Sequence, residues 1–172
     1  MDSKKIRNMT FAALLAALTC VATLLIQVPT PTKGYLNLGD CIVNLSAWLL
    51  GPVYGAAAAG IGSAMADWIS GYIIYIPATL IIKGSMAVVS YFLYRAVSNI
   101  ANSVFSRIIS AVTAEIVMVL GYGIFEACMY GSVATAMLGT LGNSVQGVMG
   151  VVSSVVIYEA VVKRIPKTVR ES

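Results

Sequence analysis

The sequence predicts an all-α integral membrane protein, a bundle of six transmembrane helices with both termini in the cytoplasm. The first observation is composition: of 172 residues, 59% are hydrophobic and only 10% are charged, and the mean hydropathy is +0.87. A soluble domain carries about 25% charged residues, so this chain could not cover its surface with polar groups. The second observation is that long apolar stretches recur along the whole chain, which predicts one membrane domain over residues 1–172.

A hydrocarbon core of ~30 Å requires about 20 apolar residues per helix. On this rule, helices are expected at about 9–27, 40–51, 53–70, 77–95, 107–126 and 140–163. The first has the basic start of a signal peptide, but its apolar run continues through Leu24–Ile26 and similar runs follow, which favours a membrane span. Residues 28–39 contain two prolines and two glycines and are predicted to form an external loop. The second helix is short for a span; it is either tilted or begins near Leu36.

The basic residues support this topology. With six spans, nine of the eleven basic residues fall on one side, which the positive-inside rule makes cytoplasmic: Lys4, Lys5, Arg7, Arg95, Arg107, Lys163, Arg164, Lys167 and Arg170. Lys33 lies in the external loop, and Lys83 lies inside a span. The net charge of +4 therefore reflects membrane orientation, and it does not indicate a nucleic-acid partner.

The sequence lacks the residues and motifs that several kinds of functional site require. The chain has no histidine, and its three cysteines (Cys20, Cys41 and Cys128) are isolated within apolar segments, so neither a metal site nor a disulfide framework is expected. The sequence contains no GxxxxGK[ST] motif for ATP and no GxSxG nucleophile motif. We therefore expect no cofactor and no enzymatic activity.

Charged and amide side chains within the spans gather toward the external side. Lys83 is the most costly, because a lysine in the membrane interior costs about 2.5–3.5 kcal/mol on insertion scales. The other polar residues at this level are Asp40, Asp67, Glu115, Glu126, Asn143 and Gln146. Five elements thus deliver polar groups to one depth, which predicts a solute pocket into which Lys83 points.

Helical spacing places these residues on inward faces. Asp67 shares a stripe of small residues with Gly55, Ala59 and Ser63. Such stripes allow helices to approach closely, which places Asp67 inside the bundle. Similar faces combine Glu115 with Tyr122 and Glu126 on one helix, and Asn143 with Gly147, Gly150 and Ser154 on another.

Each of these residues also has a purely structural interpretation. Lys83 either neutralises Asp67 as an ion pair or contacts a ligand directly. Asp40 is either a pocket residue or the N-cap of the second helix. Four aromatic residues are more typical of interfacial anchors than of ligand contacts: Trp48, Trp68, Tyr72 and Tyr75. If Lys83 neutralises Asp67, the remaining acids suit a ligand with N–H donors, such as an aminopyrimidine-like edge.

The first helix carries two pairs of alanines four residues apart, Ala12 with Ala16 and Ala13 with Ala17. Small residues at this spacing permit close packing with another helix. The other helix lies either in the same bundle or in a partner protein.

Four segments in this order resemble the S components of energy-coupling factor (ECF) transporters: the alanine-rich first helix, "GYLNLGD", "GPVYGAAAAGIGSAMADWISGY" and "YIPATLIIKGSMA". The resemblance covers nearly the whole chain. It implies a membrane subunit that captures a vitamin or related micronutrient from outside a bacterial cell. Such subunits work with a transmembrane coupling protein (the T component) and two cytosolic ATPases.

The resemblance also implies roles for individual residues. In the family, the alanine pattern of the first helix contacts the coupling protein, which assigns Ala12, Ala13, Ala16 and Ala17. The first external loop acts as a lid, which gives Tyr35, Asn37 and Asp40 gating or binding roles. Ligand contacts in the family come mainly from this loop and the last three helices. The substrate-binding candidates are thus Asn37, Asp40, Asp67, Lys83, Glu115, Tyr122, Glu126 and Asn143.

Within the family, the sequence looks closest to the branch for hydroxymethylpyrimidine, pyridoxine-type and queuosine-related substrates, with the riboflavin branch next. A self-sufficient carrier is a competing interpretation, in which Glu115 and Asp67 would relay protons for symport. A membrane enzyme and a purely structural subunit are further alternatives. Binding of a solute would separate the transport interpretations from the structural one.

Overall fold

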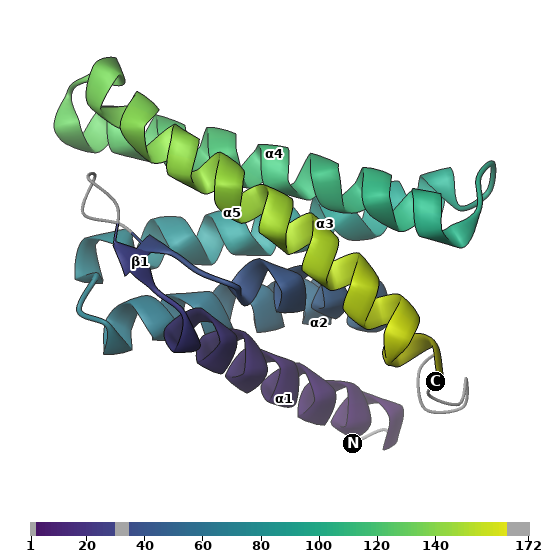
Figure 1. The fold of residues 1–172 in the computed structure, drawn as a ribbon. Coiled ribbons are helices and arrows are strands. Elements are labelled where there is room, and N and C mark those ends of the chain that lie inside the picture. Colours follow the sequence, from purple (N-terminus) through teal and green to yellow (C-terminus); the bar gives the residue numbers. More distant parts are fainter. Residues whose placement is uncertain (1–2, 30–34, 165–172) are drawn as a thin grey trace.

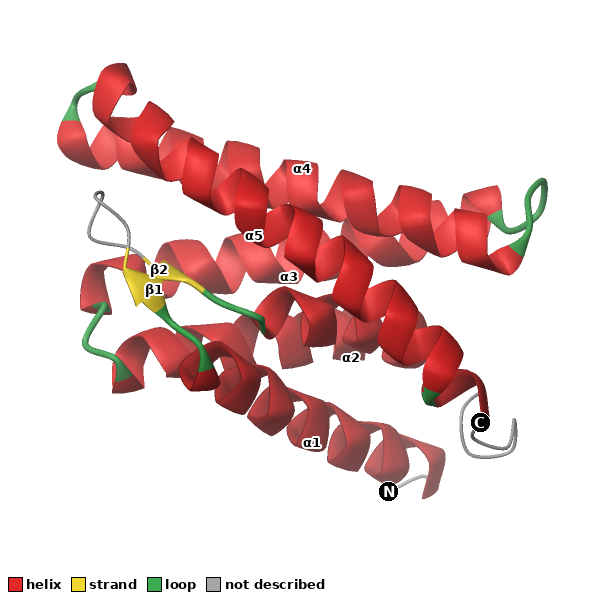
Figure 2. Ribbon diagram, viewed as in Figure 1, coloured by secondary structure: helices red, strands yellow, loops and turns green. Residues whose placement is uncertain are grey.

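A computed structural model describes residues 3–29 and 35–164, and in it the chain is a bundle of long helices (Figures 1 and 2). The elements are α1 (Ser3–Leu25), β1 (Val28–Pro29), β2 (Tyr35–Leu36), α2 (Gly39–Ile69), η1 (Ile73–Tyr75), α3 (Ile76–Val97), α4 (Ser103–Tyr130), α5 (Val133–Ala160) and η2 (Val162–Arg164). The two short strands pair antiparallel and lie over one end of the bundle. The all-α prediction is confirmed for the body of the protein.

Capping residues set the helix ends between α4 and α5. The Asn102 side chain accepts a hydrogen bond from the backbone N–H of Phe105 (2.9 Å) at the start of α4. Gly131, with φ of +61°, ends α4, and the Ser132 side chain accepts from the N–H of Thr135 (3.2 Å) to begin α5. The helix predicted over 140–163 therefore begins at residue 133, because the cap precedes several apolar residues. Likewise, the helix predicted over 107–126 extends at both ends.

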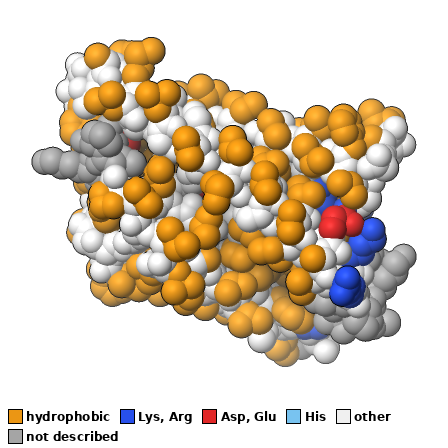
Figure 3. Space-filling view, in the orientation of Figure 1, with side chains coloured by type: hydrophobic (Ala, Val, Ile, Leu, Met, Phe, Trp, Pro, Cys, Tyr) orange, Lys and Arg blue, Asp and Glu red, His pale blue; other side chains and the backbone are white. Residues whose placement is uncertain are grey.

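Five helices among the described residues are long and apolar enough to cross a membrane, with α2 counted once. Their outer surfaces are rich in exposed apolar side chains, as one face shows in Figure 3. The expected helix at 9–27 is α1, which begins earlier, and the one at 77–95 is α3. The prediction of six spans is not confirmed, because the segments predicted at 40–51 and 53–70 are two arms of α2.

Gly51 reverses the chain inside α2. Its backbone angles, φ 77° and ψ −173°, are not helical, and Pro52 follows. A Cβ placed on Gly55 would lie 2.7 Å from the carbonyl oxygen of Ser46, although residues nine apart in a straight helix are separated by about 13 Å. The arms therefore fold back on each other. The first arm, residues 39–50, is about 18 Å long and does not match a ~30 Å hydrocarbon core.

Small residues form the helix crossings. A Cβ on Gly62 would collide with the carbonyl oxygen of Ala16, so α1 and α2 approach to backbone contact there. A Cβ on Gly60 would lie 2.7 Å from the carbonyl oxygen of Leu80, which indicates equally close packing of α2 on α3. The central core includes Met86 and Met118, both fully buried.

The two ends of the bundle differ in charge. Figure 1 shows the start of α1 and the end of α5 at the same end as the α3–α4 turn, opposite the two strands. Most described basic residues belong to elements that begin or finish there, and Figure 3 shows Lys and Arg side chains gathered at this end. Lys33, Lys167 and Arg170 lie outside the described residues.

Replacing Gly51 with alanine should destabilise the protein by about 1–3 kcal/mol, because φ 77° with ψ −173° lies in a region open essentially to glycine. Thermal unfolding in detergent would measure the change. Gly84→Ala is the matched control: its Cβ would meet Ala56 O at an ordinary 3.7 Å. Equal stability of the Gly51→Ala variant and wild type would contradict the reversal at Gly51.

Candidate functional site: a polar cavity beneath the two strands

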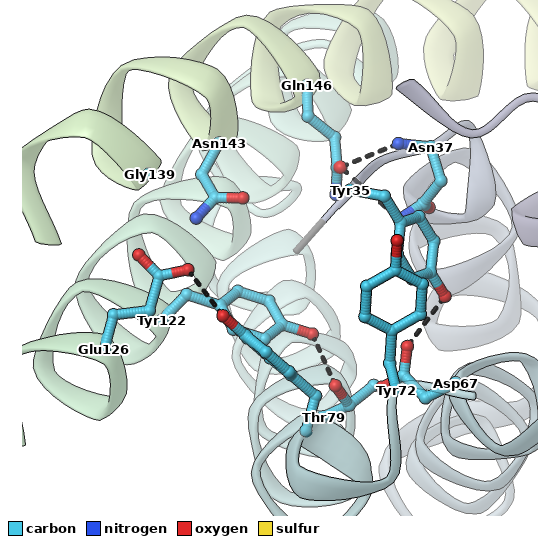
Figure 4. Close-up of a pocket in the computed structure, with 11 residues that line it drawn as sticks. Tyr35, Asn37, Asp67, Tyr72, Thr79, Tyr122, Glu126, Gly139, Asn143 and Gln146 are labelled. Atoms are coloured by element: carbon cyan, nitrogen blue, oxygen red, sulfur yellow. Dashed lines mark hydrogen bonds between the residues drawn. The ribbon is translucent and has the colours of Figure 1, made fainter. Parts of the chain in front are cut away.

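A small cavity lies beneath the strand segment, meaning β2 and the residues that follow it to Asn37, and is lined by residues of α2, α3, α4 and α5 (Figure 4). Its volume, about 30 Å³ of space for the centres of water-sized molecules, is room for one or two waters. Aromatic, acidic and amide side chains share the lining: Tyr35, Asn37, Asp67, Tyr72, Tyr75, Thr79, Tyr122, Glu126, Gly139, Asn143 and Gln146. The cavity is thus nearly filled by its own side chains.

Hydroxyl groups hold the cavity walls together. The hydroxyl of Tyr35 donates to Asp67 Oδ1 (2.7 Å), and the Tyr35 ring lies 4.7 Å from the Tyr72 ring. The hydroxyls of Thr79 and Tyr122 share a hydrogen bond of 2.9 Å between α3 and α4. Burial and the negative charge of Asp67 raise the pKa of Tyr35 well above its ordinary value, so its hydroxyl remains a donor.

Gln146 connects the strand segment to the bundle interior. Its Oε1 accepts from the backbone N–H of Asn37 (2.9 Å), and its Nε2 donates to Asp40 Oδ2. The side chain of Asn37 in turn accepts from the backbone N–H of Gly39 (2.9 Å) at the start of α2. One amide thereby ties the covering segment to a carboxylate buried below the cavity.

Asn143 is different from its neighbours. Figure 4 shows its carboxamide directed into the cavity, with no hydrogen bond to the other residues drawn. Its side chain is mostly buried, at 8% exposed. An amide offers both N–H donors and a carbonyl acceptor, so this group is available to the edge of a ligand.

Two glutamates of α4 occupy the space left by glycines of α5. A Cβ on Gly150 would lie 2.5 Å from Glu115 Oε1, and a Cβ on Gly139 would collide with Glu126 Oε2. The two glutamates are eleven residues apart, as are the two glycines, which corresponds to about three helical turns. The same face of α4 therefore meets the same face of α5 at two depths.

Lys83 pairs with Asp40, so the alternative in which it neutralises Asp67 is wrong. The Lys83 ammonium also lies 3.2 Å from Met118 Sδ. Asp67 instead accepts the Tyr35 hydroxyl. Asp40 does not cap α2, because Leu38 is the N-cap residue and Asp40 lies within the first turn with its carboxylate directed inward. Both partners of the ion pair are at most 2% exposed.

Five of the eight predicted substrate-binding residues line the cavity: Asn37, Asp67, Tyr122, Glu126 and Asn143. The other three, Asp40, Lys83 and Glu115, lie in a separate buried cluster that Gln146 joins to the cavity.

The candidate set omitted other lining residues, among them Thr79, Gly139 and Gln146. Spacing could have indicated two of them, because Gln146 is three residues from Asn143 and Thr79 is four from Lys83. Tyr72 and Tyr75 also line the cavity, although interfacial anchoring was the favoured interpretation; Trp68 is 64% exposed, as an anchor would be.

The four alanines of α1 line a separate apolar groove of about 690 Å³ between α1 and α2. Ala13 and Ala17 are exposed, while Ala12 and Ala16 are partly buried. The carbonyl of Ala16 packs against Gly62. The stripe therefore contributes to packing within the bundle and still leaves an open surface.

Among the described residues, no group of three or more His, Cys, Asp or Glu side chains could hold a metal ion. Apolar spans around a covered polar cavity define a membrane-embedded protein with a candidate solute site at one end.

Residues 3–163 match the family described as "ECF-type riboflavin transporter, S component", and the chain belongs to this family. The resemblance to S components is confirmed at this level. The branch for hydroxymethylpyrimidine, pyridoxine-type and queuosine-related substrates is not confirmed.

Two relatives illustrate the match. A structure reported as "Structure and mechanism of the S component of a bacterial ECF transporter" has the same fold, with a TM-score of 0.72 and 19% identity over 92% of this chain and 97% of that chain. An uncharacterized protein of Pyrococcus woesei is 38% identical over 90 residues, 52% of this chain. The match spans 60% of that relative's length.

Replacing Lys83 with methionine should destabilise the protein by about 3–5 kcal/mol, because Asp40 would lose its counter-charge inside the bundle. Adding Asp40→Asn should restore part of the loss, since the unpaired charge is then removed. Thermal unfolding of both variants in detergent measures this. A Lys83→Met variant as stable as wild type would contradict the pairing.

Proposed function

We propose that the protein captures a nitrogen heterocycle of the riboflavin type from outside the cell, as the substrate-binding S component of an ATP-driven importer. The observation that carries the proposal is the covered cavity with the Asn143 carboxamide directed into it. The family match supports the class of transporter. ATP hydrolysis belongs to separate subunits in this proposal, and the chain itself is not an enzyme.

The cavity chemistry suits a planar ring with mixed donors and acceptors. Tyr35, Tyr72 and Tyr75 supply aromatic faces for stacking. Asn143 and Gln146 supply amides, which can match the alternating C=O and N–H groups of a flavin edge. Acidic groups at Asp67 and Glu126 favour a ligand that presents N–H or hydroxyl donors.

Charge supports an external position for the cavity. Tyr35 of β2 and Asn37 line the cavity. Figure 1 shows the strands at the end opposite the start of α1 and the end of α5, where Lys and Arg side chains gather in Figure 3. The positive-inside rule supports the proposal that the basic end, and both termini with it, faces the cytoplasm. The proposed location is therefore a bacterial plasma membrane, with the strand segment as an external lid.

The α1–α2 groove is the proposed contact for a transmembrane coupling protein, which would join the subunit to two cytosolic ATPases. Exposed Ala13 and Ala17 leave a surface that a partner helix can approach closely. Its mainly apolar lining, which includes Ile61 and Met65, suits contact within the bilayer.

Cavity size favours a second candidate, a smaller ring such as hydroxymethylpyrimidine, a pyridoxine-type compound or a queuosine-related base. Drug-sized ligands occupy pockets of about 300–1,000 Å³, so riboflavin requires outward movement of the lid and rearrangement of the cavity side chains. A single-ring compound requires less rearrangement.

Titration of the purified protein with riboflavin, followed by flavin fluorescence, tests the proposal. Saturable binding that pyridoxine and hydroxymethylpyrimidine do not displace would support the flavin assignment. Binding of the single-ring compounds alone would favour the second candidate. If no compound binds to folded protein, the proposed function is wrong.

Riboflavin uptake into vesicles that contain only this protein distinguishes an importer subunit from a self-sufficient symporter. The importer interpretation predicts no riboflavin accumulation driven by a proton gradient. Accumulation that Glu115→Gln abolishes would favour symport.

Tyr35→Phe should release bound riboflavin about 10-fold faster, because the lid loses its hydroxyl bond to Asp67 while keeping the ring beside Tyr72. Stopped-flow measurement of flavin fluorescence gives the dissociation rate. Tyr54→Phe, in the α1–α2 groove, is the control and should not change it. Equal rates for Tyr35→Phe and wild type would argue against a latch at Tyr35.

A further inference from the structure

A buried polar cluster lies next to the cavity, between the first arm of α2 and helices α3, α4 and α5, and shares Gln146 with the cavity lining. Its members are Asp40, Asn44, Lys83, Glu115 and Gln146, all at most 5% exposed. Lys83 pairs with Asp40, which also accepts from Gln146. The Asn44 amide donates to Glu115 Oε1 (3.1 Å), and Ser90 donates to Asn44 Oδ1 (2.9 Å).

Charge does not balance in this cluster. Two carboxyl groups share one ammonium, and Lys83 directs its ammonium to Asp40. Among the described residues, Arg107 is the other buried basic side chain, and it pairs with Glu159 at the opposite end of the bundle (2.9 Å). An ionised Glu115 would leave a net negative charge in the membrane interior, at a cost of several kcal/mol.

Glu115 itself has an unused oxygen. Its Oε2 is buried and has no hydrogen-bond partner among the described residues. The titratable groups around Glu115 are Asp40 and Cys41 of α2 and Lys83 of α3; the facing positions of α5 are glycines, Gly147 and Gly150. Cys41 is an ordinary free thiol and supplies no positive charge.

An apolar groove leads to this carboxyl group from outside the bundle. The groove, about 450 Å³, runs between α4 and α5 and is lined by Glu115 together with residues such as Ile116, Val119 and Val148. Val148 is 65% exposed, on a surface that faces lipid in the membrane. Because Gly147 has no side chain, the groove reaches the side of Glu115.

We propose that Glu115 is a buried proton-binding site beside the α4–α5 groove, and that apolar carboxyl reagents reach and modify it through this groove. The proton neutralises the second carboxyl group of the cluster and leaves the Lys83–Asp40 pair intact. This inference concerns a different site from the cavity and does not depend on which solute the cavity binds.

The probe is N,N′-dicyclohexylcarbodiimide, an apolar reagent that requires a protonated carboxyl group. The carboxyl proton moves to a carbodiimide nitrogen, the carboxylate oxygen adds to the central carbon, and the adduct rearranges to a stable N-acylurea. The whole reagent is retained, and nothing leaves. The intact protein therefore gains the mass of one reagent per modified carboxyl group.

The experiment treats full-length protein in lipid nanodiscs at neutral pH, in parallel with a water-soluble carbodiimide, and maps the adduct by peptide mass spectrometry. We expect Glu115 to be modified by the apolar reagent and not by the water-soluble one. Glu115→Gln should lose the adduct, whereas Glu159→Gln should keep it. Mapping on wild type gives a result even if Glu115→Gln fails to fold.

Absence of an adduct at Glu115 in folded wild-type protein would overturn the proposal, as would modification by the water-soluble reagent alone. Infrared spectroscopy checks the proton separately: the carbonyl band of a protonated carboxyl should disappear in Glu115→Gln and persist in Glu159→Gln. An unchanged band in Glu115→Gln would show that Glu115 is ionised and would also overturn it. Riboflavin titration of the same samples reports on the cavity alone, so the two proposals can fail independently.

Discussion

The ion pair between Lys83 and Asp40 is the interaction on which the rest of this structure depends. Neither charge can reach water, so each must remain beside the other as long as the bundle is folded. The pair joins α3 to the first turn of α2. Gln146 extends this connection to α5 and to Asn37, the residue after β2. The buried lysine, although costly in a membrane, thereby fixes Asp40 and Gln146 in place below the cavity.

Gly51 makes that arrangement possible. Because the chain reverses there, the first arm of α2 stays inside the bundle and brings Asp40 and Asn44 to the level of Glu115. In a continuous helix of the same length, Asp40 and Asn44 would lie far from Glu115 along the membrane normal. The same reversal places Trp48 near the basic end, where Arg107 lies 5.9 Å from its ring and 3.5 Å from that of Tyr158.

The sequence was sufficient for the membrane class, the helical body and five of the eleven residues that line the cavity, because apolar length and four-residue spacing are local properties. It was not sufficient for the partner of Lys83. The sequence predicts Asp40 and Asp67 at the same depth, and choosing between them requires knowing how the arms of α2 pack. The predicted start of the last helix at residue 140 is wrong, because the Ser132 side chain caps α5 and the helix begins at Val133.

The glutamate–glycine contacts between α4 and α5 have an evolutionary consequence. At each contact, the carboxyl group fills the volume that a methyl group would occupy on the opposite helix. A relative that carries alanine at the position of Gly139 or Gly150 should therefore carry a shorter or differently shaped side chain at the position of Glu126 or Glu115, respectively. Substitutions at these paired positions should therefore occur together across the family. The number of buried glutamates on α4 would then change together with the distance between α4 and α5.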